Sequence, residues 1–189
     1  EHLSNPVNLS LIVIGLISIV LFIFIENKQQ YPLLDLSIFK IKAFSVSVWI
    51  SGVTSIGLFG SIFLVPLLLQ NVYGYGPIIT GLIFLPSALL SGIFMTVGGR
   101  ILDKKGASGV VTAGLVITAI STYILGTMTM ETSLLLIFII MAVRGIGMGL
   151  SSMPATTAGM NAIPDNIVSR GSAMNNVLRQ MSSALGIVF

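Results

Sequence analysis

The stretch Leu134-Leu-Leu-Ile-Phe-Ile-Ile-Met-Ala-Val-Arg-Gly-Ile-Gly-Met-Gly149 decides the fold of this chain. It lies in an apolar run from about Thr132 to Ala155, and a helix that spans a bilayer needs about 20 mainly apolar residues. At about 1.5 Å per residue, Arg144 would lie about 18 Å from one end of this helix, near the bilayer midplane. A cation there costs at least about 2.5–3.5 kcal/mol on insertion scales. Arg144 therefore predicts either a functional residue, which lines a polar pathway, binds an anionic group or tunes the pKa of a carboxylate, or a guanidinium tied to neighbouring carbonyls for packing.

Apolar segments of similar length recur on both sides of this run, so we expect six membrane-spanning helices in all. The alternating strands of about ten residues that build a membrane barrel do not occur in the sequence. The predicted class is an all-α polytopic membrane protein. The other segments run from about Val7 to Ile25, Phe44 to Leu69, Ile78 to Val97, Ser108 to Met128, and from Ser172 to the last residue, Phe189.

Composition excludes several classes of protein. Hydrophobic residues make up 54% of the 189 residues and charged residues only 8%, whereas a soluble domain carries about 25% charged residues. The net charge of +3 is scattered among apolar runs, so we expect no nucleic-acid partner. The sequence lacks cysteine, a P-loop and the common hydrolase and dinucleotide motifs, and its single histidine, His2, is near one end. We therefore expect no enzyme activity, no metal site and no cofactor.

Basic residues alternate between the predicted loops and set the orientation. Loops 26–43 and 98–107 carry three each and loop 156–171 carries one, whereas loops 70–77 and 129–131 carry none. Basic loops stay in the cytoplasm, so the N-terminal end of this segment is expected outside. Tyr73 and Tyr75 would then lie in an outer aromatic belt. The amphipathic stretch from Leu33 to Phe39 predicts a short interfacial helix.

Small residues and prolines mark where helices would pack or bend. Gly145 and Gly149 form a small-xxx-small step that lets two helix backbones approach closely. Pro66, Pro86 and Pro154 are expected to break the helical hydrogen-bond ladder. These features fit either tight packing with ordinary kinks or the hinges of a moving transporter.

Polar residues near the predicted span ends form a second group of candidates. We expect residues 98–106 to form a tight cytoplasmic turn, in which Asp103 caps a helix, pairs with Arg100 or pairs with a basic residue elsewhere. The alternative is a solvated loop without specific geometry. Gln70 lies at the outer edge of its span. Asn175, Asn176, Arg179 and Gln180 crowd the start of the last span, where they would line a cytoplasmic mouth or, for Arg179, reach the headgroups.

Taken together, these pieces resemble the major facilitator superfamily, and more narrowly its fourteen-helix drug:proton antiporter branch. The chain starts without Met and stops in an apolar run, so we expect a piece of a longer protein. The resemblance rests on residues 32–39 (Pro-Leu-Leu-Asp-Leu-Ser-Ile-Phe), 65–70 (Val-Pro-Leu-Leu-Leu-Gln), 74–77 (Gly-Tyr-Gly-Pro), 81–86 (Gly-Leu-Ile-Phe-Leu-Pro), 99–106, 144–149 and 171–180.

The resemblance implies a placement for each part. Residues 1–43 would form an inserted helix, the second of two between the six-helix halves, and the cytoplasmic loop after it. Residues 44–189 would form the first five helices of the C-terminal half. The loop with Gly99, Arg100, Asp103, Lys104 and Gly106 would gate the inward and outward states. The sites implied for transport or coupling are Gln70, Arg144, Gly145, Gly149, Asn175 and Arg179.

The implied activity is export of apolar or cationic drugs from the cytoplasm by alternating access, driven by a proton gradient. The implied partners are a small-molecule drug, protons, the lipid bilayer and a missing N-terminal half, in a bacterial inner membrane. The spans hold no acidic residue, so the proton-binding acid would lie outside this segment. The alternatives are a facilitator of another cargo (a lipid, sugar or metabolite) and a membrane scaffold that transports nothing.

Overall fold

The computed structural model describes residues 36–129 and 131–188, together with positions 10, 13–15, 17–18, 20–21 and 24–25. It divides into two compact units, residues 1–36 and 37–189. In the first unit the described positions from 10 to 25 are helical. The rest of the predicted first span, Lys28 and the start of the predicted interfacial helix lie outside the described residues.

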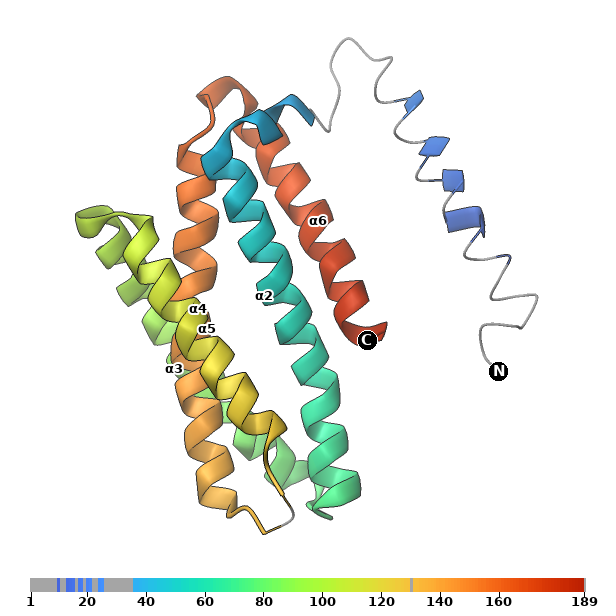
Figure 1. Ribbon diagram of the computed structural model, residues 1–189, viewed down its shortest axis with the longest axis vertical. Coiled ribbons are helices and arrows are strands. Elements are labelled where there is room, and N and C mark those ends of the chain that lie inside the picture. Colours follow the sequence, from blue (N-terminus) through green and yellow to red (C-terminus); the bar gives the residue numbers. More distant parts are fainter. Residues whose placement is uncertain are drawn as a thin grey trace. The chain divides into compact units, whose positions relative to one another are not determined.

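The second unit is a bundle of helices that run alternately up and down (Figure 1). No strand occurs among the described residues, and the all-α prediction is confirmed. Short turns of other helical types, labelled η, adjoin the long helices. The elements are η2 (Leu36–Lys40), α2 (Lys42–Leu67), the π-helical turn η3 (Leu68–Val72), α3 (Pro77–Lys105), α4 (Ala107–Gly126), α5 (Leu134–Asn161), η4 (Asp165–Ile167) and α6 (Val168–Val188).

Four stretches of this unit are long and apolar enough to cross a membrane. They are α2 with η3, α3, α4 and α5, and each corresponds to one of the predicted spans, although α4 ends two residues before its predicted end and α5 begins two residues after its predicted start. The sixth predicted span is also a helix, α6, but its first half is polar, and it does not reach the same apolar content. The structure is consistent with a partial facilitator fold.

Several helices are longer than the apolar runs that predicted them. Helix α3 continues eight residues beyond Val97 to Lys105, and α5 continues six residues beyond Ala155 to Asn161. Loop 156–171 was therefore predicted too long, because it is shortened from both sides by helix. Hydropathy predicts where a chain leaves the hydrocarbon core of the bilayer. A helix can continue into polar sequence as long as its backbone hydrogen bonds are satisfied.

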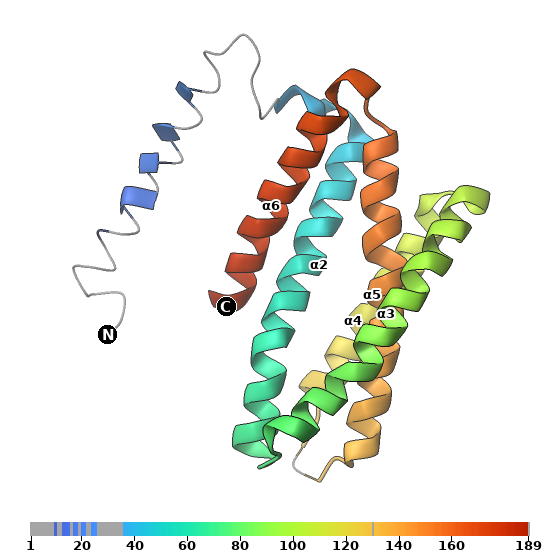
Figure 2. The ribbon, with the colours of Figure 1, turned by 180° about the vertical axis from the view of Figure 1, so that it is seen from behind.

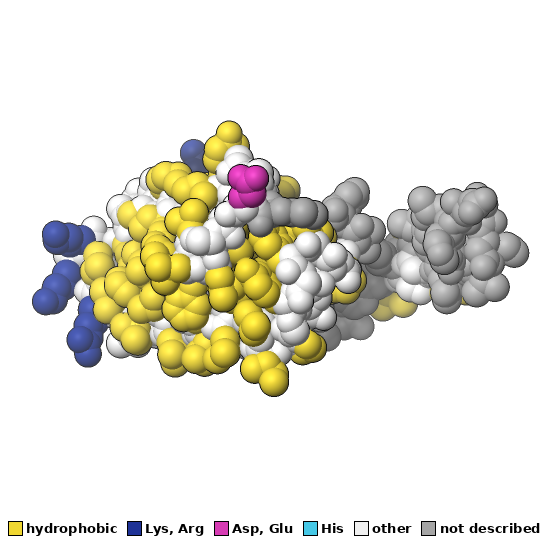
Figure 3. Space-filling view, turned by 90° about the horizontal axis from the view of Figure 1, so that it is seen from below, with side chains coloured by type: hydrophobic (Ala, Val, Ile, Leu, Met, Phe, Trp, Pro, Cys, Tyr) yellow, Lys and Arg dark blue, Asp and Glu magenta, His cyan; other side chains and the backbone are white. Residues whose placement is uncertain are grey.

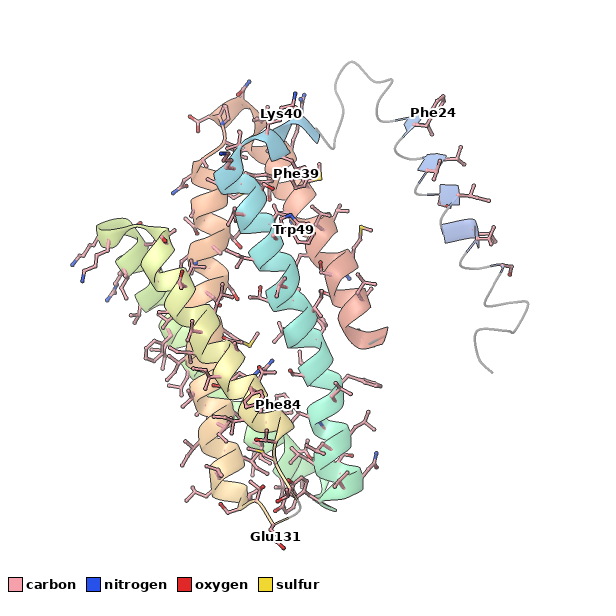
Figure 4. The ribbon with its side chains drawn as sticks, in the orientation of Figure 1. Phe24, Phe39, Lys40, Trp49, Phe84 and Glu131 are labelled. Carbon is pink, nitrogen blue, oxygen red and sulfur yellow. The ribbon has the colours of Figure 1, made fainter. Side chains whose placement is uncertain are left out.

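The two ends of the bundle differ in charge. Lys40 and Glu131 lie at opposite ends (Figure 4). Because consecutive helices are antiparallel, the start of α2, the end of α3 and the start of α6 share one end, and that end collects Lys42, Lys105 and Arg170. Viewed from the other end, hydrophobic side chains cover most of the visible face and basic groups gather at one margin (Figure 3). Large apolar side chains such as Trp49 and Ile78 are exposed on the sides, as lipid contact requires.

Helix α5 packs closely against both α3 and α4, and glycines make this possible. A Cβ atom on Gly145 would overlap the backbone of Ser87 in α3, and one on Gly149 would overlap the backbone at Ser91. A Cβ on Gly147 would lie 2.7 Å from the backbone nitrogen of Thr118 in α4. The predicted close approach at Gly145 and Gly149 is therefore confirmed, and α3 is the helix that they contact.

Helix α6 lies beside α2 (Figures 1 and 2). Here too backbones touch, because a Cβ on Gly186 would lie 2.8 Å from Cα of Ile56. Helices α2 and α5 also pack together, and the hydroxyl of Ser47 donates a hydrogen bond of 2.5 Å to the carbonyl of Ala155.

Each of the three prolines lies inside a helix. Helices α3 and α5 continue through Pro86 and Pro154, and α2 continues for one residue beyond Pro66 before the π-helical turn η3. Neighbouring helices and local π geometry can satisfy the backbone groups that a proline frees inside a membrane. Pro154 is also a packing residue, because it contacts Gly98 of α3.

Replacing Gly145 by alanine should lower the free energy of unfolding of the full-length protein by about 1–3 kcal/mol, because the new methyl group has to displace the backbone of α3. Gly99→Ala is the matched control, since a Cβ there meets nothing within 4 Å. Thermal unfolding of the two purified variants measures the difference. Equal stability of both variants would contradict the packing described here.

Gly106 connects α3 to α4 as a single residue with φ +82° and ψ 170°. This conformation is essentially confined to glycine and costs other residues about 1–3 kcal/mol. We expect Gly106→Ala to lower stability by this amount, whereas Gly109→Ala, inside α4 and facing open space, should be neutral or slightly stabilising. The same thermal measurement tests this, and a neutral Gly106→Ala variant would refute it.

Candidate functional site

Arg144 is the most deeply buried charged residue in the described part of the chain, with 2% of its surface exposed. Its Nη2 donates hydrogen bonds to the carbonyl of Gly57 at 2.9 Å and to Oγ of Ser61 at 2.7 Å, both in α2. Its Nε donates a longer bond of 3.4 Å to Oγ1 of Thr122 in α4. One guanidinium on α5 thus joins three helices.

The two partners of Arg144 in α2 also bond to each other. The hydroxyl of Ser61 donates to the carbonyl of Gly57 at 2.6 Å, so it accepts from Arg144 while it donates to the same carbonyl that Arg144 contacts. A planar guanidinium with donors in a fixed fork suits such a pair of acceptors. The contact predicted as the packing alternative for Arg144 is therefore present.

Arg144 also lines a cavity of about 480 Å³ between α2, α3, α5 and α6. Arg179 and Gln180 of α6 line the same cavity. Phe59, Phe84 and Met148 supply part of its apolar wall. The hydroxyl side chains on this wall number eight, and they are Ser51, Thr54, Ser55, Ser87, Ser91, Ser152, Thr156 and Ser183.

The spacing of serines in the sequence indicates this polar wall, although the predicted spans and site residues did not include it. Ser47, Ser51 and Ser55 recur every fourth residue in the apolar run of α2, and Ser87 and Ser91 do the same in α3. Residues four apart share one face of a helix. Such stripes in a membrane helix indicate a polar face turned away from lipid. Gly57, Ser61 and Thr122, the partners of Arg144, carried no comparable signal.

Arg179 lies deeper than its predicted place at the start of the last span. Helix α6 begins at Val168, so eleven residues separate its start from Arg179, which corresponds to about 16 Å of helix. The side chain is exposed and lines the cavity. The polar first turns of α6 hid the true helix start, because the prediction relied on hydropathy.

Two other predicted residues do not line this cavity. Asn175 is buried in α6 with 8% of its surface exposed, and its Oδ1 has no hydrogen-bond partner among the described residues. Gln70 is exposed in the π-helical turn η3. Nearby, the hydroxyl of Tyr73 donates to the carbonyl of Thr129, and the rings of Tyr73 and Tyr75 stack at 5.9 Å.

The predicted gating turn is mostly helix. Residues 99–105 form the last turns of α3, and Gly106 alone makes the connection. Asp103, Arg100 and Lys104 are exposed on this extension, and the described residues form no ion pair between Asp103 and Arg100. Asp103 caps no helix start, because the N-cap of α4 is Gly106. The predicted turn, the predicted cap by Asp103 and its predicted pair with Arg100 are therefore corrected, whereas a pair with a basic residue elsewhere stays a prediction.

A second cavity, of about 530 Å³, opens between α2, η3 and α4. Its wall is mainly apolar and includes Ser61 and Thr122, two hydrogen-bond partners of Arg144. The Arg144 contact therefore stands between two cavities of similar size.

Long apolar helices and an exposed apolar surface define a polytopic helical membrane protein. Residues 5–187 match the Major Facilitator Superfamily, and the chain belongs to this family of membrane transporters, which are not enzymes.

The relatives carry transporter and resistance names. The chain is 37% identical over 183 residues to an uncharacterized MFS-type transporter, YhcA, of Bacillus subtilis, covering 97% of this chain and 34% of that protein. It is 31% identical to the lincomycin resistance protein LmrB of Listeria innocua, covering 93% of this chain and 37% of the relative. It is 29% identical to the multidrug resistance protein B homolog of Mycobacterium tuberculosis, covering 84% and 30%. The chain thus spans about a third of the length of these relatives.

Arg144 and Ser61 should be energetically coupled. Ser61→Ala and Arg144→Gln each remove one member of a hydrogen bond to a charged group, which is worth about 1–2 kcal/mol in this setting. The double variant should lose less stability than the sum of the losses of the two single variants. Thermal unfolding of the three variants of the full-length protein measures the coupling. Strict additivity would show that the contact contributes nothing.

Proposed function

We propose that this chain is part of a proton-coupled multidrug efflux transporter that exports apolar or cationic drugs by alternating access. The cavity beside Arg144 carries the proposal. Its volume of about 480 Å³ falls in the range of about 300–1,000 Å³ that is usual for drug-sized ligands. Its wall is mainly apolar, and such a wall would hold ligands with little directional selectivity.

The names of the relatives support this choice of cargo. Two of the relatives above are named for lincomycin resistance and for multidrug resistance. Because the chain covers about a third of their length, transport would belong to a longer protein. In that protein, residues 1–43 would be an inserted helix with its loop, and residues 44–189 the first five helices of the C-terminal half.

The orientation follows from the charged ends of the bundle. The end with Lys40, Lys42 and Lys105 would face the cytoplasm, and the end with Glu131 would face outward. The N-terminal end of the segment would then be outside. The protein would be a multi-pass protein of the bacterial cell membrane.

The mechanism would have the two halves of the transporter rock about the cavity. Proton coupling needs a titratable group, which the missing N-terminal half would supply. Arg144 would link α2, α4 and α5 so that the cavity wall moves as one body, with Gly145 and Gly149 holding α3. Gly99, Arg100, Asp103, Lys104 and Gly106, at the end of α3, would meet the other half in one of the two states. Gln70 would lie at the outer mouth, Arg179 along the pathway, and Asn175 in the support behind it.

The test is dye efflux from cells that make the full-length protein. Cells loaded with ethidium or with neutral N-phenyl-1-naphthylamine should lose dye only while a proton gradient exists, and they should grow at higher lincomycin concentrations than control cells. Arg144→Ala should slow efflux at least about tenfold, the effect of about 1.4 kcal/mol in the transport barrier. Arg100→Gln is a weaker variant to compare, because Arg100 lies outside the cavity wall.

Two results would count against this function, and a third would count against the role of Arg144. Dye loss that is independent of the gradient would remove proton coupling. Retention of both dyes together with unchanged lincomycin sensitivity would favour the facilitator of another cargo. Unchanged efflux by Arg144→Ala, at equal protein levels, would remove Arg144 from the site.

A further inference from the structure

We propose that the cavity between α2, α3, α5 and α6 binds an oxyanion, a carboxylate or a sulfonate, between the guanidinium groups of Arg144 and Arg179. The inference rests on the proposed function, because it names the chemistry that the same cavity would select. Three observations support the inference: the positive charges of Arg144 and Arg179, the unused hydrogen-bond donors on the cavity wall, and the positions of the two arginines within their helices.

Both charged side chains that line this cavity are cations. Arg144 approaches it from α5 and Arg179 from α6, and no aspartate or glutamate lines it. Among the described residues neither arginine forms an ion pair or a hydrogen bond to a carboxylate. The described part of the cavity therefore carries two positive charges without a counter-charge.

Donors remain available at the cavity. Arg144 uses Nε and Nη2 for its bonds to α2 and α4, and Nη1 donates to no described residue. The only fully enclosed polar side-chain atom without a partner in the described part is Oδ1 of Asn175, so Nη1 keeps accessible surface. A guanidinium with its outer edge free can still donate to an oxyanion.

Two serines on the wall add hydroxyl donors. Ser55 on α2 and Ser87 on α3 are 5% and 9% exposed and line the cavity, and neither hydroxyl is bonded to a described residue. Most serines inside apolar helices bond to the carbonyl four residues earlier, as Ser61 and Ser183 do here. Ser55 and Ser87 therefore have hydroxyls free to donate to a group in the cavity.

The depth of the arginines makes a counter-charge energetically important. Arg179 lies about 16 Å from the start of α6 and Arg144 about 15 Å from the start of α5, so each lies about three turns inside its helix. Charged residues at this depth are costly unless they pair with one another, with carbonyls or with a charge of opposite sign. Arg144 is partly compensated by the carbonyl of Gly57, whereas Arg179 has no such contact among the described residues.

The oxyanion has two conceivable sources that share the same chemistry. It is either part of a transported molecule or a carboxylate side chain from the remainder of the transporter that closes over the cavity. In the first case the guanidiniums select anionic cargo, which would replace the cationic drugs of the proposed function. In the second case they neutralise a carboxylate that would otherwise attract cationic cargo.

The experiment compares three dyes that bind to the purified full-length transporter in nanodiscs. Anilinonaphthalene sulfonate and N-phenyl-1-naphthylamine share their rings and differ by the sulfonate, and ethidium supplies the cation. Fluorescence titrations, corrected with empty nanodiscs, give the dissociation constants. The variants are Arg179→Gln, Arg179→Lys, the double variant Ser55→Ala with Ser87→Ala, and Arg170→Gln as a control that removes a charge from α6 outside the cavity. Size-exclusion chromatography confirms that each is folded.

If the oxyanion belongs to the cargo, Arg179→Gln should weaken sulfonate binding about tenfold or more, leave the neutral dye unchanged, and be partly rescued by Arg179→Lys. The serine double variant should weaken sulfonate binding by a few-fold, and Arg170→Gln should do nothing. If a side-chain carboxylate is the partner, Arg179→Gln should leave sulfonate binding unchanged and tighten ethidium binding about tenfold.

The proposal is wrong if Arg179→Gln changes none of the three affinities or weakens all three alike. Its failure is distinct from failure of the proposed function. A transporter with charge-dependent binding that exports neither ethidium, N-phenyl-1-naphthylamine nor lincomycin would keep the site and lose the efflux role. Gradient-driven efflux without charge-dependent binding would do the opposite.

Discussion

The bundle depends on how one buried cation is satisfied. The guanidinium of Arg144 is kept from bulk water inside a bilayer, so its Nε and Nη2 donors need oxygen atoms on neighbouring helices. The carbonyl of Gly57 and the hydroxyls of Ser61 and Thr122 supply them, which sets α2 and α4 at fixed positions around α5. A membrane helix bundle gains little from apolar contact alone, since lipid tails are equally apolar, and a directional contact of this kind fixes the arrangement.

The glycines of α5 act beside this contact, because they let the backbones of neighbouring helices approach α5 closely. Gly145 and Gly149 turn toward α3, and Gly147 turns toward α4. Three helices are thereby held at backbone distance, and α6 pairs separately with α2. The cavity lies where α2 and α6 face α3 and α5. One side of its wall therefore belongs to the tightly packed helices α3 and α5, and the other side to the pair α2 and α6.

The sequence was a good guide to the helices and to the depth of Arg144, because both follow from counting along an apolar run. It was a poorer guide to helix ends, since α3 continues through the polar stretch up to Lys105 and α6 starts within one. The latter error placed Arg179 near the surface. The partners of Arg144 could not be predicted, because Gly57 is 87 residues away and no local pattern marks it. The cavity was missed for the same reason, although the serine stripe of α2 indicated a polar face.

The single-residue connection at Gly106 leaves α3 and α4 no slack at that end of the bundle. A reporter group or an epitope inserted there would have to unwind a helix to find room, and deletion of the residue would pull two antiparallel helices out of register. Length variation is far easier to accommodate between α5 and α6, where residues 162–167 form an irregular link with one short 3₁₀ turn. Fusion points and spectroscopic labels for following the helices in action therefore belong in that link.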